Sequence, residues 1–256
     1  MTRPNYPEGH DLLQGKNVVI TAAAGTGIGY ATAKRCLEEG ASVLLSDNHP
    51  ERLEKSANNL ANLGDVKFIV CDVTKEDQVQ ALVTAAESTF GTIDVWINNA
   101  GLGGSCNLID MTDDQWQRVL DVTLTGTFRC VRAAMNHMQK HKRGVIINNS
   151  SVLGWRAQKQ QENYAAAKAG VMALTRCAAL EAAEFGVRIN AVAPSLAMHP
   201  FLSKVMDEDA LEELARREAF GRPAEVWEVA NVMVFLGSDL SSYMTGETVS
   251  VSSQRA

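Results

Sequence analysis

Short apolar runs alternate with longer amphipathic segments along the whole chain. The first run, residues 17–21, is rich in β-branched residues and lies between Gly15 and a stretch of small residues, so it predicts a buried strand. Residues 29–39 then place apolar side chains at helical spacing and end at Gly40, and a second apolar run covers residues 41–47. Together these segments predict a β-α-β unit.

The same alternation continues to the C-terminus. Further strands are predicted at residues 66–71, 94–98, 144–149, 188–193 and 248–251, and further helices at 50–63, 75–90, 112–137, 164–185 and 224–236. Largely apolar strands that are separated by helices are typical of a parallel sheet covered on both faces. With about seven strands, the pattern predicts an α/β fold with a doubly wound, Rossmann-type sheet.

The chain is predicted to form a single domain, because 256 residues with 46% hydrophobic content suit one α/β domain with a substantial core. Residues 1–14 are predicted to be a flexible polar lead-in, and residues 15–256 the folded domain. Residues 195–222 form the least regular stretch, with an acidic piece at 207–218 that we expect to be helical. A long excursion after a strand of such a sheet lies over the ligand crevice, so we expect a substrate lid there.

Composition and charge exclude several classes of function. The net charge of -6 argues against a nucleic-acid partner. The five cysteines show no Cys-x-x-Cys spacing, which favours neither a disulfide framework nor a metal site. The first 14 residues lack a signal-peptide core and no apolar run could span a membrane. We therefore expect a cytoplasmic protein that does not contact membranes.

A glycine-rich loop follows the first predicted strand. It reads Thr21-Ala22-Ala23-Ala24-Gly25-Thr26-Gly27-Ile28-Gly29. Small residues let the backbone approach a pyrophosphate, and a helix N-terminus offers unpaired N–H groups. A tight turn without a ligand is the alternative, but the position between the first strand and the first helix favours a dinucleotide site.

Asp47 ends the second predicted strand, at the spacing where an acidic residue meets the ribose of a dinucleotide. A carboxylate there accepts hydrogen bonds from two ribose hydroxyls and repels a 2'-phosphate, and neither Thr26 nor Asn48 supplies a positive charge. The sequence therefore predicts NAD in preference to NADP. The alternative is that Asp47 only begins a turn before Pro50.

Tyr164 and Lys168 are four positions apart in a predicted helix, so the phenol and the ammonium project from the same face. A nearby cation in a poorly solvated cleft favours the phenolate, which would lower the tyrosine pKa toward general acid/base use. Ser151 follows a strand upstream. Taken alone, the pair is more simply read as an amphipathic helix face.

The motifs together resemble the short-chain dehydrogenase/reductase family in its single-domain form, over residues 13–251. The resemblance rests on the glycine-rich loop, Cys71-Asp72-Val73-Thr74, Asn98-Asn99-Ala100-Gly101, Ser151, Tyr164 with Lys168, Arg188-Ile189-Asn190-Ala191-Val192-Ala193-Pro194, and Gly221-Arg222-Pro223. It implies that residues 15–256 are an NAD(P)-binding catalytic domain. It also implies a homo-oligomer, usually a tetramer in this family.

The resemblance implies a role for individual residues. Ser151 would hydrogen-bond the reacting oxygen, Tyr164 would donate or remove its proton, and Lys168 would hold the nicotinamide ribose and lower the tyrosine pKa. Asp72 and Val73 would contact the adenine. The candidate cofactor-binding residues are Thr21, Ala22, Gly25, Thr26, Gly27, Ile28, Asp47, Asp72, Val73, Asn99, Ala100, Gly101, Tyr164, Lys168 and Pro194.

The sequence departs from the family pattern at four places, one of which is Pro194-Ser195 after the sixth strand, where the family often has Pro-Gly. Ala22 follows Thr21 where the family usually has glycine, which would shift the phosphate contacts. Thr123 replaces the usual asparagine of the central helix. In the family, that asparagine holds a water in a proton relay. Thr123 is therefore a candidate catalytic residue, although its hydroxyl offers one functional group fewer than the asparagine amide. Ser252-Ser253 replaces a glycine pair near the C-terminus.

The substrate wall is predicted from residues 102–108, 153–162 and the lid. These stretches combine apolar side chains with Arg156 and Lys159, which suits a bulky hydroxyl or ketone compound with an anionic handle such as coenzyme A. The alternative is that both cations are solvated loop charges. The loop and Pro194-Ser195 are similar to actinobacterial short-chain enzymes of steroid ring breakdown, which handle hydrindane-type acyl-CoA esters.

The predicted function is hydride transfer between a nicotinamide cofactor and a secondary alcohol or ketone, with a bulky hydroxyacyl-CoA as the favoured substrate. A 3-oxoacyl-thioester reductase is an alternative, because the chain also resembles such enzymes more loosely. A non-catalytic dinucleotide-binding sensor or scaffold is another, motivated by Thr123 and the altered loop. The joint presence of Ser151, Tyr164 and Lys168 disfavours the sensor, since a pure binder does not need them.

Overall fold

The central sheet has seven strands, all parallel, in the order β3-β2-β1-β4-β5-β6-β9. The computed structural model describes residues 3–199 and 208–253. The strands are β1 Asn17–Ile20, β2 Ser42–Asp47, β3 Val66–Val70, β4 Val95–Asn98, β5 Gly144–Asn149, β6 Val187–Pro194 and β9 Thr248–Val251. The predicted α/β fold with a doubly wound sheet is confirmed.

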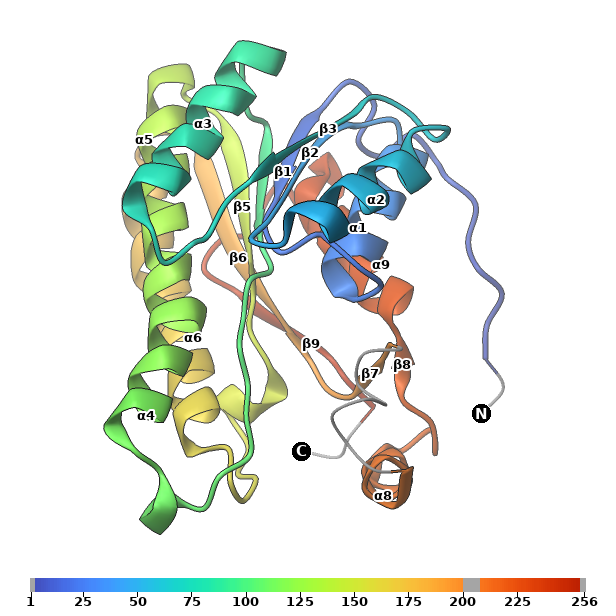
Figure 1. Cartoon of the computed structure of the whole chain (residues 1–256). Helices are drawn as coiled ribbons and strands as arrows, with labels where there is room; N and C mark the ends of the chain where they lie inside the picture. Colours follow the sequence, from blue (N-terminus) through green and yellow to red (C-terminus); the bar gives the residue numbers. More distant parts are fainter. Residues whose placement is uncertain (1–2, 200–207, 254–256) are drawn as a thin grey trace.

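Helices cover both faces of this sheet, as Figure 1 shows. One face carries α1 Ile28–Glu38, α2 Pro50–Leu60 and α9 Val226–Gly237, and the other carries α3 Glu76–Phe90, α4 Asp113–Leu120, α5 Gly126–His141 and α6 Glu162–Ala183. Each face has its own hydrophobic core. In β1, Val18 and Ile20 belong to one core and Val19 to the other, which explains why the strand is apolar at successive positions.

The chain reverses direction across the sheet between β1 and β4. From β1 it moves outward to β2 and β3, and it then returns to place β4 on the other side of β1. At such a switch point the loops that follow the two strands diverge and leave a crevice at their carboxyl ends. Asp47, Asn98 and Asn149 are each the last residue of their strand, so the topology delivers them to this edge.

The central helix is interrupted, whereas the sequence predicted a continuous helix over residues 112–137. A π-helical turn, Asp121–Thr125, lies between α4 and α5. Its Thr123 side chain is turned to the backbone of Leu102. At Gly126 an added Cβ would lie 2.7 Å from Val73 Cγ2, so the helix passes too close to the segment after β3 for a larger residue.

The segment before β1 is packed along its described part, whereas residues 1–14 were predicted to be a flexible lead-in. Arg35 donates to the Pro7 carbonyl at 3.2 Å, and the Glu39 carboxylate accepts from the backbone N–H groups of His10 and Leu12. Leu13 is completely buried. A buried ion pair on α1, Arg35 with Glu39 at 2.5 Å, thus supplies the partners that hold residues 3–14.

Within the predicted lid, residues 200–207 lie outside the described residues. Residues 208–217 form α8 Glu208–Arg217, close to the expected helix at 207–218. On either side of it, β7 Ala197–Met198 pairs in parallel with β8 Ala224–Glu225, a two-stranded sheet that the sequence did not predict. None of the described helices combines the length and the apolar character that crossing a membrane requires.

Candidate active site

Ser151, Tyr164 and Lys168 come together beyond the carboxyl end of β5. Ser151 begins a single 3-10 turn after this strand, and the other two residues lie on the first turns of α6. Ser151 and Tyr164 line the same cavity, and Lys168 Nζ lies 5.5 Å from the centre of the Tyr164 ring. The helical spacing therefore places the phenol and the amine at one site, as the sequence predicted.

Lys168 is only 2% exposed, and Nζ donates a 2.6 Å hydrogen bond to the carbonyl oxygen of Asn149. Burial lowers the pKa of its amine from 10.5 to about 7, because removing the ammonium from water penalises the charged form. A Cβ at Gly101 would approach Nζ to 3.3 Å. Glycine at this position therefore gives the amine room at the crevice.

The pKa of Tyr164 is raised above its ordinary value, whereas a lowered value was expected from the neighbouring lysine. Burial of the phenol is the main cause, and the hydrogen bond with Ser151 acts in the opposite direction. Lys168 is not among the causes of this shift, and its own burial disfavours the ammonium form. The phenol of Tyr164 is therefore protonated at neutral pH.

A relay of amide side chains that sequence reasoning missed joins Lys168 to the glycine-rich loop. Asn149 Nδ2 donates to Asn99 Oδ1 at 2.9 Å, and Asn99 Nδ2 donates to the carbonyl of Ala22 at 2.9 Å. Asn149 Oδ1 is buried and has no partner among the described residues. The pairs Asn98-Asn99 and Asn148-Asn149, at the ends of two apolar strands, were the available signal.

A second series of hydrogen-bonded polar side chains lies on the opposite face of β4 and β5. Asn98 pairs in register with Asn148 and donates to it at 2.8 Å, and Asn148 donates to Thr175 on α6 at 2.9 Å. Trp96 Nε1 completes this series by donating to Asn98 Oδ1 at 2.7 Å. These satisfied buried groups fix the spacing of β4, β5 and α6, and thus the position of the residues at their ends.

The glycine-rich loop is held from several sides. Thr21 Oγ1 accepts from the backbone N–H groups of Asn99 and Ala100, at 3.0 and 3.3 Å, which joins β1 to β4. Asp47 Oδ2 accepts from Ala24 N at 3.2 Å, and Ser56 Oγ accepts from Gly25 N at 2.9 Å. Asp47 is therefore part of the loop's support, which its sequence position did not reveal.

Ala22 occupies the left-handed region of backbone space, with φ at 51°. Alanine thus replaces the family's usual glycine, and this left-handed conformation costs an alanine about 1–2 kcal/mol. The shape of the loop is nevertheless kept, because the Ala22 carbonyl is held by Asn99 and packs on Gly29, where a Cβ would lie 2.4 Å from that oxygen.

The loop fits a dinucleotide. An added Cβ at Gly25 or Gly27 would meet nothing within 4 Å, so both glycines border open space. Gly27 caps α1 without a side-chain hydrogen bond, and the first turn of α1 has no acidic residue. A phosphate could therefore approach Thr26, Gly27 and Ile28 at the positive end of the helix dipole.

The other predicted cofactor residues lie at the same edge of the sheet. Asp72 and Val73 follow β3, where Asp72 Oδ1 accepts from both the N–H and the hydroxyl of Thr74 at 2.9 and 2.8 Å. Pro194 is the last residue of β6. Their contacts with adenine and nicotinamide remain predictions.

Thr123 is completely buried, and its hydroxyl is engaged with one backbone segment. Oγ1 accepts from Leu102 N at 2.9 Å and donates to the Leu102 carbonyl at 3.2 Å. The hydroxyl proton is thus committed, so Thr123 cannot donate it to a relay water without releasing Leu102. The geometry favours a positioning role for Thr123 over the predicted relay role.

We expect Thr123→Val to lower the free energy of unfolding by about 1–3 kcal/mol, because it leaves the Leu102 N–H and carbonyl without their partner. Urea denaturation followed by circular dichroism measures this, and Thr123→Ser, which keeps the hydroxyl, is the matched control. A loss of turnover in Thr123→Val with unchanged stability would instead support the relay role.

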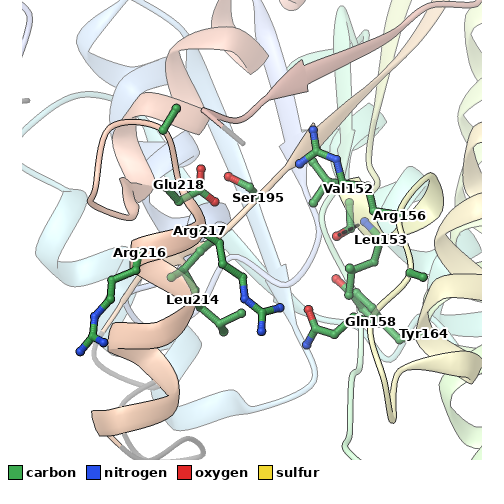
Figure 2. Close-up of a pocket in the computed structure, with 14 residues that line it drawn as sticks. Val152, Leu153, Arg156, Gln158, Tyr164, Ser195, Leu214, Arg216, Arg217 and Glu218 are labelled. Carbon is green, nitrogen blue, oxygen red and sulfur yellow. Dashed lines mark hydrogen bonds between the residues drawn. The ribbon is translucent and has the colours of Figure 1, made fainter. Parts of the chain in front are cut away.

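A cavity of about 650 Å³ opens beside Ser151 and Tyr164. Figure 2 shows it between the turn after β5 and the C-terminal end of α8. Arg217 points toward Gln158 across the cavity, whereas Arg216 points away. The lining residues are Ser151, Val152, Leu153, Arg156, Ala157, Gln158, Tyr164, Ser195, Leu196, Leu214, Arg216, Arg217, Glu218 and Ala219.

This lining overlaps part of the predicted substrate wall and differs from the rest. Leu153 and Arg156 line the cavity as expected, but Lys159 and the segment 102–108 do not contribute to its described lining. Arg216 and Arg217 were not foreseen, and each is paired with a glutamate one turn earlier on α8. Among the described residues, no cluster of His, Cys, Asp or Glu side chains is arranged to hold a metal ion.

Comparisons with known proteins match this chain over nearly its whole length. A family model described as enoyl-(acyl carrier protein) reductase matches residues 22–253. A relative from Mycobacterium tuberculosis, (5R,7aS)-5-hydroxy-7a-methyl-1-oxo-2,3,5,6,7,7a-hexahydro-1H-indene-carboxyl-CoA reductase, is 59% identical over 254 residues, 98% of this chain and 97% of that protein. A 3-oxoacyl-(acyl-carrier-protein) reductase from Thermotoga maritima is 39% identical over 240 residues, 93% and 97% of the two chains.

Solved structures agree with these matches. A short chain dehydrogenase from Mycobacterium smegmatis superposes with a TM-score of 0.89 at 55% identity, covering 100% of this chain and 99% of that one. Levodione reductase superposes with a TM-score of 0.90 at 35% identity, covering 94% and 97%. The chain therefore belongs to the short-chain dehydrogenase/reductase family and is an oxidoreductase that acts on hydroxyl or ketone groups.

Proposed function

We propose that this protein interconverts a secondary alcohol and a ketone on a bulky acyl-CoA ester, with NAD as the hydride carrier. The observation that carries the proposal is the placement of Ser151 and Tyr164 on the wall of a 650 Å³ cavity that Arg156 and Arg217 also line. Such a cavity has room for a bicyclic alcohol, and its cations suit an anionic handle. The Mycobacterium tuberculosis relative, whose name specifies an indene-carboxyl-CoA ester, supports this substrate class.

The chemistry divides between cofactor and protein. Nicotinamide, when bound, supplies the site that accepts or gives the hydride. Tyr164 exchanges a proton with the reacting oxygen, and Ser151 can donate its hydroxyl hydrogen there because its Oγ already accepts from Leu153 N at 3.2 Å. Lys168 donates to the Asn149 carbonyl, which places its amine beside the tyrosine, and it would hold the nicotinamide ribose.

The preference for NAD over NADP rests on Asp47. Its carboxylate is buried at the end of β2 and is fixed by Ala24 N and His49 N, so a 2'-phosphate would meet a held negative charge. Arg52 Nη2 lies 3.7 Å from Asp47 Oδ1, a cation that sequence reasoning missed. Its side chain is half exposed, and its charge is therefore screened more than that of Asp47.

A 3-oxoacyl-thioester reductase is the second candidate, supported by the Thermotoga maritima relative. The sensor or scaffold is disfavoured, since Ser151, Tyr164 and Lys168 are assembled at one site. We further propose a cytoplasmic homo-oligomer, a tetramer by family analogy. The exposed Phe128 and Leu180 on α5 and α6 support a subunit contact.

A substrate panel tests the proposed function. Hydroxyacyl-CoA esters of bicyclic and linear acids, the corresponding free alcohols and 3-oxoacyl thioesters are each assayed with NAD(H) and NADP(H) by absorbance of the reduced nicotinamide. We expect the highest kcat/KM for the bicyclic hydroxyacyl-CoA, with NAD favoured by at least about tenfold, as expected for one unfavourable charge contact of about 1.4 kcal/mol. Activity confined to free alcohols would remove the CoA assignment, and a preference for NADP would remove the role of Asp47.

A further inference from the structure

Segment 102–107, which follows β4, has little within itself to fix its path. It reads Leu-Gly-Gly-Ser-Cys-Asn, and four of its six residues are exposed. Glycine allows the backbone more conformations than any other residue, so two successive glycines do not define a path by themselves. Contacts with other parts of the chain must therefore hold this segment in place.

The segment passes beside the candidate catalytic tyrosine. At its start, the Thr123 hydroxyl bonds the N–H and the carbonyl of Leu102. One residue further, a Cβ added at Gly103 would lie 3.6 Å from Cδ2 and 3.9 Å from Cε2 of Tyr164, which are ordinary contact distances. The space between this backbone and the ring edge therefore admits little more than a methyl group, so the ring cannot swing far in this direction.

Gln160, in the turn before α6, ties the far end of the segment. Both polar atoms of its side chain are bonded, since Nε2 donates to Asn107 Oδ1 at 2.8 Å and Oε1 accepts from Ser105 Oγ at 2.9 Å. Its carbonyl oxygen accepts from Cys106 N at 3.3 Å. The segment is thus fixed at both ends, on either side of the two glycines.

The backbone of Gln160 indicates that its side chain matters at this position. Its φ is 66°, in the left-handed region, which is unfavourable for a residue with a Cβ and freely open to glycine. A turn of this shape would form more readily with glycine. Another residue keeps such a conformation only where surrounding contacts outweigh its cost, and residues of this kind cluster at functional sites. The hydrogen bonds to residues 105–107 are the contacts that do so here.

The ring of Tyr164 needs support because part of it borders open space. Tyr164 lines the cavity of about 650 Å³, to which residues 102–107 do not contribute. A ring beside a cavity is not confined from that side, so packing on its remaining edges has to set its direction. Segment 102–107 supplies such packing along the Cδ2–Cε2 edge.

We infer that Gln160 is a positioning residue for Tyr164: it holds segment 102–107 in place, and the segment confines the tyrosine ring. Gln160 thus acts through the tyrosine and not on the substrate itself. This inference rests on the proposed function, because it takes Tyr164 as the group that exchanges a proton with the alcohol or ketone.

Two measurements test these contacts without turnover. Gln160→Ala removes both side-chain hydrogen bonds, and we expect the Cys106 amide, which is bonded to Gln160, to exchange its hydrogen about fivefold faster or more. In protein labelled with 3-fluorotyrosine, the fluorine resonance of Tyr164 is identified by its loss in Tyr164→Phe. In Gln160→Ala this resonance should move toward that of Tyr243, which is fully exposed.

Two further variants separate the holding of the segment from general effects. Gln80→Ala removes an exposed glutamine side chain that is bonded to Glu76 on α3, and it should leave exchange, resonance and rates at wild-type values. Gln160→Gly removes the same side-chain bonds as Gln160→Ala and also the cost of the left-handed backbone. If Gln160 only shaped the turn, Gln160→Gly would behave like the wild type. We expect both Gln160 variants to lose the confinement of Tyr164.

Steady-state kinetics with the best substrate of the panel test the effect on catalysis. We expect Gln160→Ala to lower kcat about tenfold, while KM and the Kd of NADH stay within about twofold. The loss is smaller than in Tyr164→Phe because Gln161 Nε2 still donates to the Gly104 carbonyl at 3.1 Å. In the Tyr164→Phe background, Gln160→Ala should lower kcat no further, because the hydroxyl that it positions is gone.

The outcomes distinguish this inference from the proposed function. Unchanged exchange or an unchanged Tyr164 resonance in Gln160→Ala overturns the inference, and so does a wild-type kcat in Gln160→Gly. An equal loss of kcat in the Tyr164→Phe background also overturns it, because Gln160 would then support the crevice in general. If no secondary alcohol or ketone is turned over, the proposed function fails, whereas the exchange and fluorine measurements still decide whether Gln160 confines Tyr164.

Discussion

Replacing Tyr164 with phenylalanine is expected to lower kcat by about 10²–10⁴-fold while NADH binding stays within about twofold of the wild type. The hydroxyl is the only group that the change removes, and the aromatic ring is kept. The raised pKa of Tyr164, caused by burial, keeps this hydroxyl protonated at neutral pH, so a proton is present for transfer to a carbonyl oxygen. Ketone reduction should therefore suffer at least as much as alcohol oxidation.

Single-turnover kinetics and fluorescence titration with NADH measure the two halves of this prediction. Tyr243→Phe is the matched control, because that tyrosine is fully exposed. If Tyr164→Phe keeps wild-type turnover, Tyr164 is not the proton-transfer group. If both turnover and NADH binding are lost, the tyrosine supports the crevice and its chemical role has to be assigned by other variants.

Replacing Lys168 with methionine is expected to lower kcat by about 10²-fold or more and to change how stability depends on pH. The amine has a pKa of about 7 in the folded protein and an ordinary value of 10.5. Between these values the unfolded lysine binds a proton that the folded one lacks. Burial of Lys168 therefore destabilises the fold fully below about pH 7, and this destabilisation is lost as pH rises toward 10.5.

The measurement is the free energy of urea unfolding at pH 6–9 for the wild type and for Lys168→Met, without added cofactor. Above pH 7, the unfolding free energy of the wild type should rise relative to that of Lys168→Met by up to about 1.4 kcal/mol per pH unit. Below pH 7, the difference between the two unfolding free energies should not depend on pH. Loss of the hydrogen bond to Asn149 shifts the whole difference without changing its slope. Lys55→Met, on the exposed face of α2, should show no slope. A flat difference throughout would mean that the amine stays charged when buried.

The asparagine pairs show where prediction from sequence stops. Asn98-Asn99 and Asn148-Asn149 each end an apolar strand, and the strand assignment followed from composition alone. That Asn99 meets Asn149, fifty positions away, depends on the register of β4 against β5. Register follows from packing on both faces, so the relay from Lys168 to Ala22 could not be predicted from the chain.

Thr123 and Tyr164 illustrate a second limit, the balance of opposing effects. The sequence predicted that a lysine near Tyr164 would lower the tyrosine pKa, but burial raises that pKa and also lowers the pKa of the lysine to about 7. The family resemblance predicted that Thr123 holds a relay water, whereas the π-helical turn directs its hydroxyl to the backbone of Leu102. The burial and the hydrogen-bond partners of a side chain depend on neighbours from several helices and strands. The local sequence pattern does not reveal these neighbours.

The chain by itself determined the order of strands and helices, the single α/β domain, the dinucleotide loop and the spacing of Tyr164 and Lys168. These follow from local rules, namely periodicity, turn residues and the four-residue spacing of a helix face. Only the tertiary structure decided that Asp47 supports the loop, that Arg52 lies beside it and that Glu218 meets Ser253, thirty-five positions later. Those contacts arise when the sheet brings distant segments to one edge and removes them from water, and the resulting desolvation and pairing set what each polar group can do.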